Sequence, residues 1–424
     1  MSLEQQTNDF FGDINPKDLI EKYGSPLYVY RESIIRDRAK NIKNLVSYPN
    51  FSVHYSAKAN SNIAILQIIK SCGLKVDAMS VGEMYAELQA GFEPDQIMFV
   101  SNNVDKKSFE YAKEHGILTV VDSISQLDLY GSVAPNTNVA IRFNPGVGDG
   151  HHEKTITAGE DTKFGVEINN DNIKKIKDIC QKHNLLLYGL HMHIGSLFLD
   201  IKNFLESGKN LLSVALQFED LNFVDLGGGF GISYKKNHGE LGLNMKKTSE
   251  QLTQFIDMFN LEYKKVYNRE LNFKIEPGRY LVAEAGVLLG TVISTKENYG
   301  TKYIGTDIGF NSFMRPTLYG AYHDIAVFCK NGKLINEIEK TNVNITGNVC
   351  ENSDNLAVDR PMPHIKQGDT IAIMDAGAYG HVMSSNYNNM QRPAEVLIRE
   401  DESVFLIRER DSLESLIQFQ KKIK

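Results

Sequence analysis

The chain lacks the features that mark membrane, secreted and nucleic-acid-binding proteins. Its 424 residues include no tryptophan and only four cysteines, which form neither a CxxC pair nor a zinc-ligand spacing. No apolar run approaches the ~18 residues of a membrane span. The first residues show no basic stretch followed by an apolar one, so we expect no signal peptide. The net charge of −7 disfavours nucleic acid as a partner. These absences predict a cytoplasmic protein with reduced cysteines.

Between residues 31 and 285, short β-like runs alternate with amphipathic helical segments. Eight runs qualify as strands, and they are 52–55, 75–77, 97–100, 118–121, 139–143, 187–193, 223–226 and 273–276. This alternation fits both a doubly wound sheet and a parallel (β/α)8 TIM barrel. The count of eight and the polar residues that end many of the strands favour the barrel.

After Gly286 the pattern changes to β-like runs with little helix between them, which predicts a largely antiparallel β domain. The run 27–30 precedes the barrel and could pair back into that domain. We therefore expect an α/β fold with a barrel over 31–285, and a second domain made of 1–30 and 286–424.

Lys58 stands just past the first predicted strand, where a barrel places its chemistry. A partly desolvated lysine loses its proton more easily and can form a Schiff base with an aldehyde. A solvated surface charge is the alternative. Polar residues also end other strands, and they include Asp77, Ser80, Arg142, Asn144, His191, His193, Ser196 and Glu276.

Three glycines, Gly227, Gly228 and Gly229, directly follow an apolar strand. Their N–H groups could converge on a phosphate, although a tight turn would need the same residues. Glu276 could pair with a pyridine nitrogen, or form a structural ion pair with Arg279. Arg279 could neutralise a phosphate or bind a substrate carboxylate.

His191 and His193 alternate along one predicted strand, so we expect both to face the same side. His193 could stack on a cofactor ring. The same pattern also serves as a metal motif, but no acidic or histidine cluster joins it in sequence, so we expect no metal. His151 and His152, in the glycine-rich loop 146–162, are expected to be loop or lid residues.

The predicted β domain carries its own polar groups. Arg315 and Tyr319 offer a cation and a phenol, Cys350 stands beside Glu351, and Tyr379 lies between small residues. Separately each could belong to the core or to a turn, and a small buried residue is the default expectation for Cys350. Together they suggest that this domain completes a site.

These stretches occur in one order from about residue 25 to 400, and the chain resembles the fold-type III pyridoxal-phosphate-dependent decarboxylases. The matching segments are Tyr55-Ser-Ala-Lys58-Ala-Asn60, Asp77-Ala-Met-Ser80-Val-Gly-Glu83, Arg142-Phe-Asn-Pro145, Lys163-Phe-Gly165, His191-Met-His193-Ile-Gly-Ser196, Gly227-Gly-Gly229, Glu276-Pro-Gly-Arg279, Arg315-Pro-Thr-Leu-Tyr319-Gly-Ala-Tyr-His323, Cys350-Glu351, Gly377-Ala-Tyr379-Gly380 and Arg392-Pro-Ala-Glu395. The chain departs from the family after Ser196, where Leu197 replaces the usual glutamine or glycine.

The resemblance implies a cofactor site in the barrel, built around pyridoxal 5'-phosphate. Lys58 would hold the cofactor as a Schiff base, His193 would stack on its ring, and Glu276 would pair with its nitrogen. The remaining cofactor contacts implied by the family pattern are Asp77, Ser196, Gly227, Gly228, Gly229, Gly278, Arg279 and Tyr379.

The resemblance also implies a homodimer with shared active sites, to which the partner subunit contributes Cys350 and Glu351. Cys350 would protonate the substrate Cα. The distal end of the amino-acid substrate would be held by Arg279, Arg315, Tyr319, Glu351 and Tyr379.

The implied activity is the decarboxylation of meso-2,6-diaminopimelate to lysine and CO2, the last step of lysine biosynthesis. The paired cations Arg279 and Arg315 suit a substrate with a second carboxylate. A sister decarboxylase acting on carboxynorspermidine, an ornithine-like or a carrier-bound amino acid is the nearest alternative. A racemase is another, although the Cys350-Glu351 pair suits protonation from one side. A non-catalytic cofactor carrier would not need the second domain.

Overall fold

The structure is a computed structural model that describes residues 1–150, 152 and 155–423. The chain forms two compact units. The barrel unit comprises Arg36–Ile232 and Leu241–Leu281, and the β unit comprises Met1–Ile35, Ser233–Glu240 and Val282–Lys424. Within the described residues, no helix has both the length and the apolar character needed to cross a membrane.

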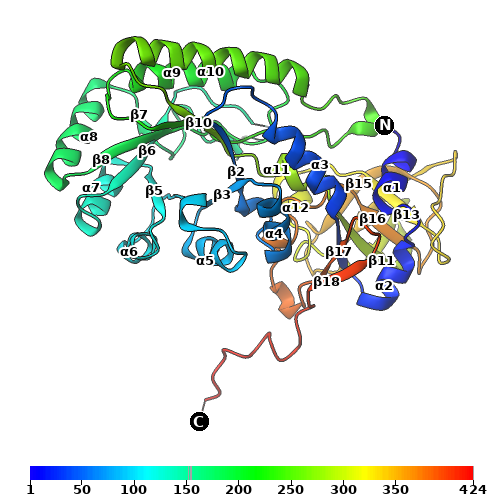
Figure 1. Ribbon diagram of the computed structural model, residues 1–424. Helices are drawn as coiled ribbons and strands as arrows, with labels where there is room; N and C mark the ends of the chain where they lie inside the picture. Colours follow the sequence, from blue (N-terminus) through cyan, green and yellow to red (C-terminus); the bar gives the residue numbers. More distant parts are fainter. Residues whose placement is uncertain (151, 153–154, 424) are drawn as a thin grey trace. The chain divides into compact units, whose positions relative to one another are not determined.

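Eight parallel strands close the barrel unit into a cylinder (Figure 1). They are β2 (Phe51–Ser56), β3 (Lys75–Ala78), β4 (Ile97–Val100), β5 (Leu118–Val121), β6 (Asn138–Asn144), β8 (Leu186–His191), β9 (Phe223–Asp225) and β10 (Asn272–Ile275). Pairing of β5 with β6 and of β10 with β2 completes the closure. A short strand, β7 (Val166–Glu167), extends from β6. The predicted TIM barrel is confirmed.

Helices follow most of the barrel strands, and α9 and α10 run side by side on its outside (Figure 1). The helices are α3 (Glu32–Lys43), which begins in the β unit, α4 (Ile63–Ser71), α5 (Val81–Gln89), α6 (Lys106–Glu114), α7 (Ile124–Val133), α8 (Asn170–His183), α9 (Lys202–Ala215) and α10 (Met245–Tyr267). Polar N-caps start several of them, because a side-chain oxygen accepts an otherwise unpaired N–H, as Ser80 does for Glu83. Every fourth or third position of α10, including Leu252, Ile256 and Phe259, is buried.

The β unit is a mostly antiparallel sheet with β1 (Leu27–Arg31) near its centre. This strand pairs antiparallel with β11 (Gly286–Asn298) and parallel with β17 (Ala394–Ile398), so the expected pairing of 27–30 into this unit is confirmed. The other strands are β12 (Thr301–Thr306), β13 (Ile325–Phe328), β14 (Thr341–Thr346), β15 (Asn355–Met362), β16 (Thr370–Ile373) and β18 (Val404–Arg408). Helices α1 (Leu3–Phe11) and α2 (Pro16–Tyr23) contribute side chains to the apolar core of this sheet.

The segment Ser233–Glu240 lies between barrel elements in sequence but belongs to the β unit. A buried ion cluster anchors it. Lys236 Nζ lies 2.6 Å from Glu284 Oε1 and 3.0 Å from Asp375 Oδ1, and Asp375 also accepts a hydrogen bond from Gln6. These carboxylates come from distant parts of the chain, so the cluster joins three stretches of the β unit.

Candidate active site

Lys58 lies in a single 3-10 turn (Ala57–Ala59) that follows β2 at the C-terminal end of the barrel. Its neighbours Ala57 and Ala59 are buried, and Lys58 itself is half-buried. Burial raises the pKa of Asp77 and Glu276, two carboxyl groups at neighbouring strand ends, and the positive charge of Lys58 partly offsets that rise. The lysine therefore faces the acidic interior of the barrel mouth, as the sequence predicts.

Asp77 and Glu276 are charged groups that the barrel removes from water. Asp77 Oδ2 accepts a hydrogen bond of 2.5 Å from Ser56 Oγ. Burial, and then the charge of Glu276, raises the pKa of Asp77 to about 7. Burial likewise raises the pKa of Glu276. Each keeps one buried oxygen, Asp77 Oδ1 and Glu276 Oε1, for which the described residues supply no hydrogen-bond partner.

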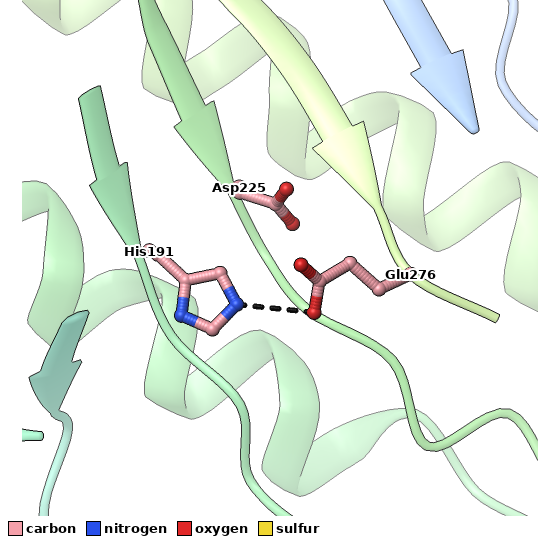
Figure 2. A group of neighbouring side chains, drawn as sticks. All are labelled: His191, Asp225 and Glu276. Atoms are coloured by element: carbon pink, nitrogen blue, oxygen red, sulfur yellow. Dashed lines mark hydrogen bonds and ion pairs between the residues drawn. The ribbon is translucent and has the colours of Figure 1, made fainter. Parts of the chain in front are cut away.

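Figure 2 shows Glu276 with His191 and Asp225, three buried side chains from neighbouring strands. His191 Nε2 lies 3.0 Å from Glu276 Oε2. Burial lowers the pKa of His191 to about 3, so it is a neutral imidazole that can donate its Nε2 proton to Glu276. Burial and the nearby Glu276 raise the pKa of Asp225 to about 7. Asp225 directly precedes the three glycines, which is the sequence feature that could have identified it.

One ligand atom from each of these residues lies within 4.8 Å of the others, a spacing that would also suit a metal ion. All three groups already form hydrogen bonds within the protein, because His191 bonds Glu276 Oε2 and Asp225 Oδ1 accepts the Gly227 N–H at 2.9 Å. Lys58, Arg142 and Lys274 add positive charge around Glu276. A single N–H group that donates to Glu276 Oε1 would give this buried oxygen a hydrogen-bond partner without displacing any of those contacts.

The prediction that His191 and His193 share one strand is wrong, because β8 ends at His191. The chain leaves the sheet there, and Met192 N–H instead donates to the carbonyl of Asp225. His193 Nδ1 accepts a hydrogen bond of 3.0 Å from Gly228 N–H. Burial keeps the pKa of His193 well below its usual value, so its ring is neutral and fixed by the glycine turn.

The loop 146–162 lies along the segment that follows β8. Asp149 and Thr157 N–H groups both donate to the Ile194 carbonyl, and Ile156 forms a β-bridge with Gly195. His152 is a loop residue whose carbonyl accepts the Thr155 N–H. His151 lies outside the described residues, so its predicted place in the loop stays a prediction.

The glycine turn permits close approach of three chain segments. A Cβ on Gly227, at φ +74°, would lie 2.2 Å from the Met192 carbonyl oxygen, and one on Gly228 would lie 2.0 Å from that of Glu276. The Gly227 N–H donates to Asp225 Oδ1 and the Gly228 N–H donates to His193 Nδ1. Contact of Gly227, Gly228 and Gly229 with a phosphate stays a prediction.

Ser196 and Arg279 form a polar pair in the barrel unit. Arg279 Nη2 donates to Ser196 Oγ at 2.9 Å, and Gly278 brings the chain within van der Waals reach of Ser56 and Ala59. A guanidinium beside a hydroxyl suits an anion such as a phosphate. The next residue, Leu197, is buried with φ +71°, a conformation that glycine adopts without strain. This is the position at which the chain departs from the family pattern.

In the β unit, Arg315 begins α12 (Arg315–Tyr319) and is buried, and Tyr319 ends the helix half-buried. Arg315 Nε donates to His323 Nε2 at 3.1 Å, and His323 Nδ1 donates to the Met374 carbonyl at 2.8 Å. The carbonyl can only accept, so it fixes the imidazole with its proton on Nδ1 and leaves Nε2 to orient the guanidinium.

Cys350 and Glu351 are exposed, so the default expectation of a buried cysteine is wrong. Asn388 Nδ2 donates to Cys350 Sγ at 3.2 Å, and the Tyr387 hydroxyl donates to Glu351 Oε1 at 2.6 Å. Sequence reasoning missed both donors, which lie in a short polar 3-10 segment (Tyr387–Asn389). Tyr379 is half-buried with φ +55°, a strained conformation of the kind found at binding sites.

Comparison with known proteins places this geometry in a family. Residues 32–283 match the family described as pyridoxal-dependent decarboxylase, pyridoxal binding domain. Diaminopimelate decarboxylase of Methanothermobacter thermautotrophicus is 38% identical over 417 residues, which cover 96% of this chain and 94% of that protein.

Two solved structures share the whole architecture. Diaminopimelate decarboxylase from M. jannaschii, in complex with L-lysine, is 35% identical with a TM-score of 0.83, covering 96% of this chain and 94% of the other. The Helicobacter pylori enzyme of the same name, also complexed with L-lysine, is 29% identical with a TM-score of 0.85, covering 96% and 99%. The chain therefore belongs to the pyridoxal-dependent decarboxylases and, among them, to the diaminopimelate decarboxylases.

Proposed function

We propose that this chain decarboxylates meso-2,6-diaminopimelate to L-lysine and CO2, with pyridoxal 5'-phosphate as its cofactor. Relatives of that name align over nearly the whole chain, and two of their structures hold L-lysine. The observation that carries the proposal is Glu276 Oε1, a buried oxygen that lacks a hydrogen-bond partner among the described residues. The positive charge of Lys58 acts on the same carboxyl group.

The barrel residues fit this cofactor. Glu276 Oε1 can accept the proton of a ring nitrogen while Oε2 stays bonded to His191. His193 offers a neutral ring that the Gly228 N–H holds in place. Ser196 and Arg279 form a ready pair for the phosphate, and the amine of Lys58 can bond to the aldehyde.

When bound, the cofactor supplies an electron sink for the charge left on the substrate Cα as CO2 departs. Glu276 keeps the proton on the ring nitrogen, and His191 supports it by donating to Oε2. Cys350 Sγ then delivers a proton to the substrate Cα. These fixed dipoles and charges preorganise the barrel end of the site before the substrate arrives.

Recognition of the distal end of the substrate would rest on Arg279, Arg315, Tyr319, Glu351 and Tyr379. A guanidinium binds the distal carboxylate, and the carboxylate of Glu351 binds the distal ammonium. Lysine-like and ornithine-like acids lack that second carboxylate. They would therefore gain no charge-assisted contact between a distal carboxylate and the buried guanidinium of Arg315.

We also propose that the protein works as a homodimer in the cytoplasm. The exposure of Cys350 and Glu351 supports shared sites, because a surface thiol completes a water-excluded site only against another protein surface. The four free thiols suit a reducing compartment.

The test is an assay of CO2 release and lysine formation from meso-diaminopimelate, with ornithine and carboxynorspermidine as competitors. Turnover of diaminopimelate alone is expected. Turnover of a competitor in its place would keep the cofactor chemistry and refute the substrate.

A mixing experiment tests the shared site. Lys58→Ala and Cys350→Ala are each expected to be inactive. If each site takes Lys58 from one subunit and Cys350 from the other, a dimer with one subunit of each variant has one intact site. Mixing them under subunit exchange should restore up to roughly a quarter of the wild-type activity by random pairing. Absence of recovery, with exchange shown by mass spectrometry, would place Lys58 and Cys350 in the same subunit's site.

A further inference from the structure

The barrel unit contains a cavity of about 720 Å³ at the end opposite Lys58. Its lining includes a residue at or near the start of every barrel strand, such as Phe51 of β2, Lys75 of β3, Leu118 of β5 and Asn272 of β10. The N-terminal mouth of a barrel is usually filled and serves stability. This volume lies within the range of pockets that bind small molecules.

The cavity is lined mainly by basic and neutral polar side chains. Lys75, Lys113 and Lys274 face one acidic residue, Asp95, whose side chain is exposed. Lys113 Nζ is engaged by the Val133 carbonyl at 2.8 Å. The neutral polar groups that complete the lining are Asn50, Ser52, His54, Tyr130, Thr137, Asn138, Tyr188, Asn222 and Asn272.

Lys274 and Lys75 are the informative members of this lining. Lys274 Nζ lies 3.8 Å from Met98 Sδ and 3.7 Å from the centre of the Phe223 ring, and Lys75 Nζ reaches only the Asp95 carbonyl, at 3.5 Å. Within the described part of the chain, neither ammonium forms an ion pair. A half-buried cation held by a sulfur atom and a ring has weak compensation for its lost water.

A purely structural role for Lys274 would be to neutralise the buried carboxylates deeper in the barrel. Asp225 and Glu276 do raise its pKa, but burial and the neighbouring Lys75 outweigh them and lower it to about 8. Burial lowers the pKa of the neighbouring His54 well below its usual value, and the charges of Lys274 and Lys75 lower it further. The lining therefore carries three lysines and one aspartate, and its charge is positive in excess.

We propose that this cavity, at the N-terminal mouth of the barrel, is a second binding site that takes a small organic anion through a carboxylate or phosphate group held by Lys75 and Lys274. The aromatic residues Phe51, Tyr188 and Phe223 line it for the carbon skeleton of such a ligand. The site is separate from the strand ends that carry Lys58, Asp77 and Glu276.

The test uses the holoenzyme, with inorganic phosphate and succinate as probes, and sodium chloride at matched ionic strength as the reference. Isothermal titration of wild type, Lys274→Met, Lys75→Met and the exposed control Lys209→Met measures the affinity of each. Methionine keeps the unbranched stem and packs beside Met98 and Phe223, so the variants should fold, which circular dichroism verifies.

Wild type and Lys209→Met should bind one or both probes, and Lys274→Met and Lys75→Met should lose about tenfold or more in affinity. Binding of phosphate alone assigns a phosphate ligand, and binding of succinate a carboxylate. Affinity should fall as pH rises through 8, where Lys274 loses its proton. Burial, Asp225, Lys75 and Glu276 set this midpoint, while His54 stays neutral there because its pKa lies well below its usual value. Equal affinities in all four proteins, or no binding at millimolar probe, would refute the site.

Discussion

The proposed site residues fall into two sets that the protein holds in different ways. In the barrel unit, Asp77 and Glu276 are buried and His193 is half-buried. Each is fixed by a hydrogen bond from a neighbouring strand end or turn. In the β unit, Cys350 and Glu351 stand exposed, each held by one donor from a 3-10 segment. The first set is preorganised by its own unit, whereas the second needs another surface to exclude water. The barrel set should therefore govern cofactor binding, and the exposed set turnover.

The largest effect is expected from Lys58→Ala, which removes the covalent anchor from the barrel set. Turnover should fall by at least ~10³-fold, and the visible absorbance of the lysine-bound cofactor should disappear. The exposed Lys209→Ala variant is the control and should retain both. If the absorbance persisted in Lys58→Ala, another lysine would be the covalent anchor. The contrast between the two sets of residues would then no longer hold for Lys58.

Cys350→Ser should separate the two sets most clearly. We expect kcat to fall by roughly 10²-fold or more, because a hydroxyl is a much weaker acid than a thiol. Cofactor absorbance should be unchanged. The free energy of unfolding should stay within about 0.5 kcal/mol, since the side chain is exposed. Loss of cofactor together with turnover would show that the exposed set also holds the cofactor.

A smaller effect is expected for His323→Gln, which tests whether buried support extends to the substrate end of the β unit. Loss of the fixed acceptor for Arg315 Nε should raise KM for diaminopimelate by roughly 3–10-fold, with a smaller change in kcat. The exposed His364→Gln is the matched control. An unchanged KM would mean that other contacts suffice to orient Arg315.

The last prediction concerns stability instead of turnover, namely the cost of burying Asp77, measured on the cofactor-free protein. Its pKa of about 7 in the fold exceeds the unfolded value near 4, so its contribution to stability is present at low pH and is lost as pH rises through 7. Asp77→Asn lacks this loss. In urea unfolding, the free energy of unfolding of the variant relative to that of wild type should rise by on the order of 2–4 kcal/mol between pH 5 and pH 8. A pH-independent difference would contradict the raised pKa.

The barrel could be predicted from sequence because its strands are short apolar runs that end in polar residues. After Gly286 the sequence predicts β-like runs at 287–294, 325–328, 343–346, 370–374, 394–399 and 403–407. Strands β12 and β15 are not among them, because many of their side chains are polar and most are half-buried or exposed. Their pairing with β14 and β11, rather than their own composition, makes them strands.

Within the candidate site, the sequence predicts that Lys58, Asp77 and Glu276 lie at strand ends. It does not show at which residue each strand stops. The error over His193 arose because β8 ends two residues early, where the backbone turns to meet Asp225. The sequence pattern does not predict the hydrogen bonds that Tyr387 and Asn388 donate or the one that His323 accepts, because these bonds join irregular or distant segments.

The central place of β1 in its sheet has a consequence for how the protein is made. Leu27 emerges early from the ribosome, yet its partner in β17 is Ala394, near the opposite end of the chain. At ~5–20 residues per second, synthesis leaves this apolar strand without that partner for about 20–70 s. Such a strand can add to the edge of another nascent sheet. The segment around β1 is therefore a place where chaperones should engage the growing chain.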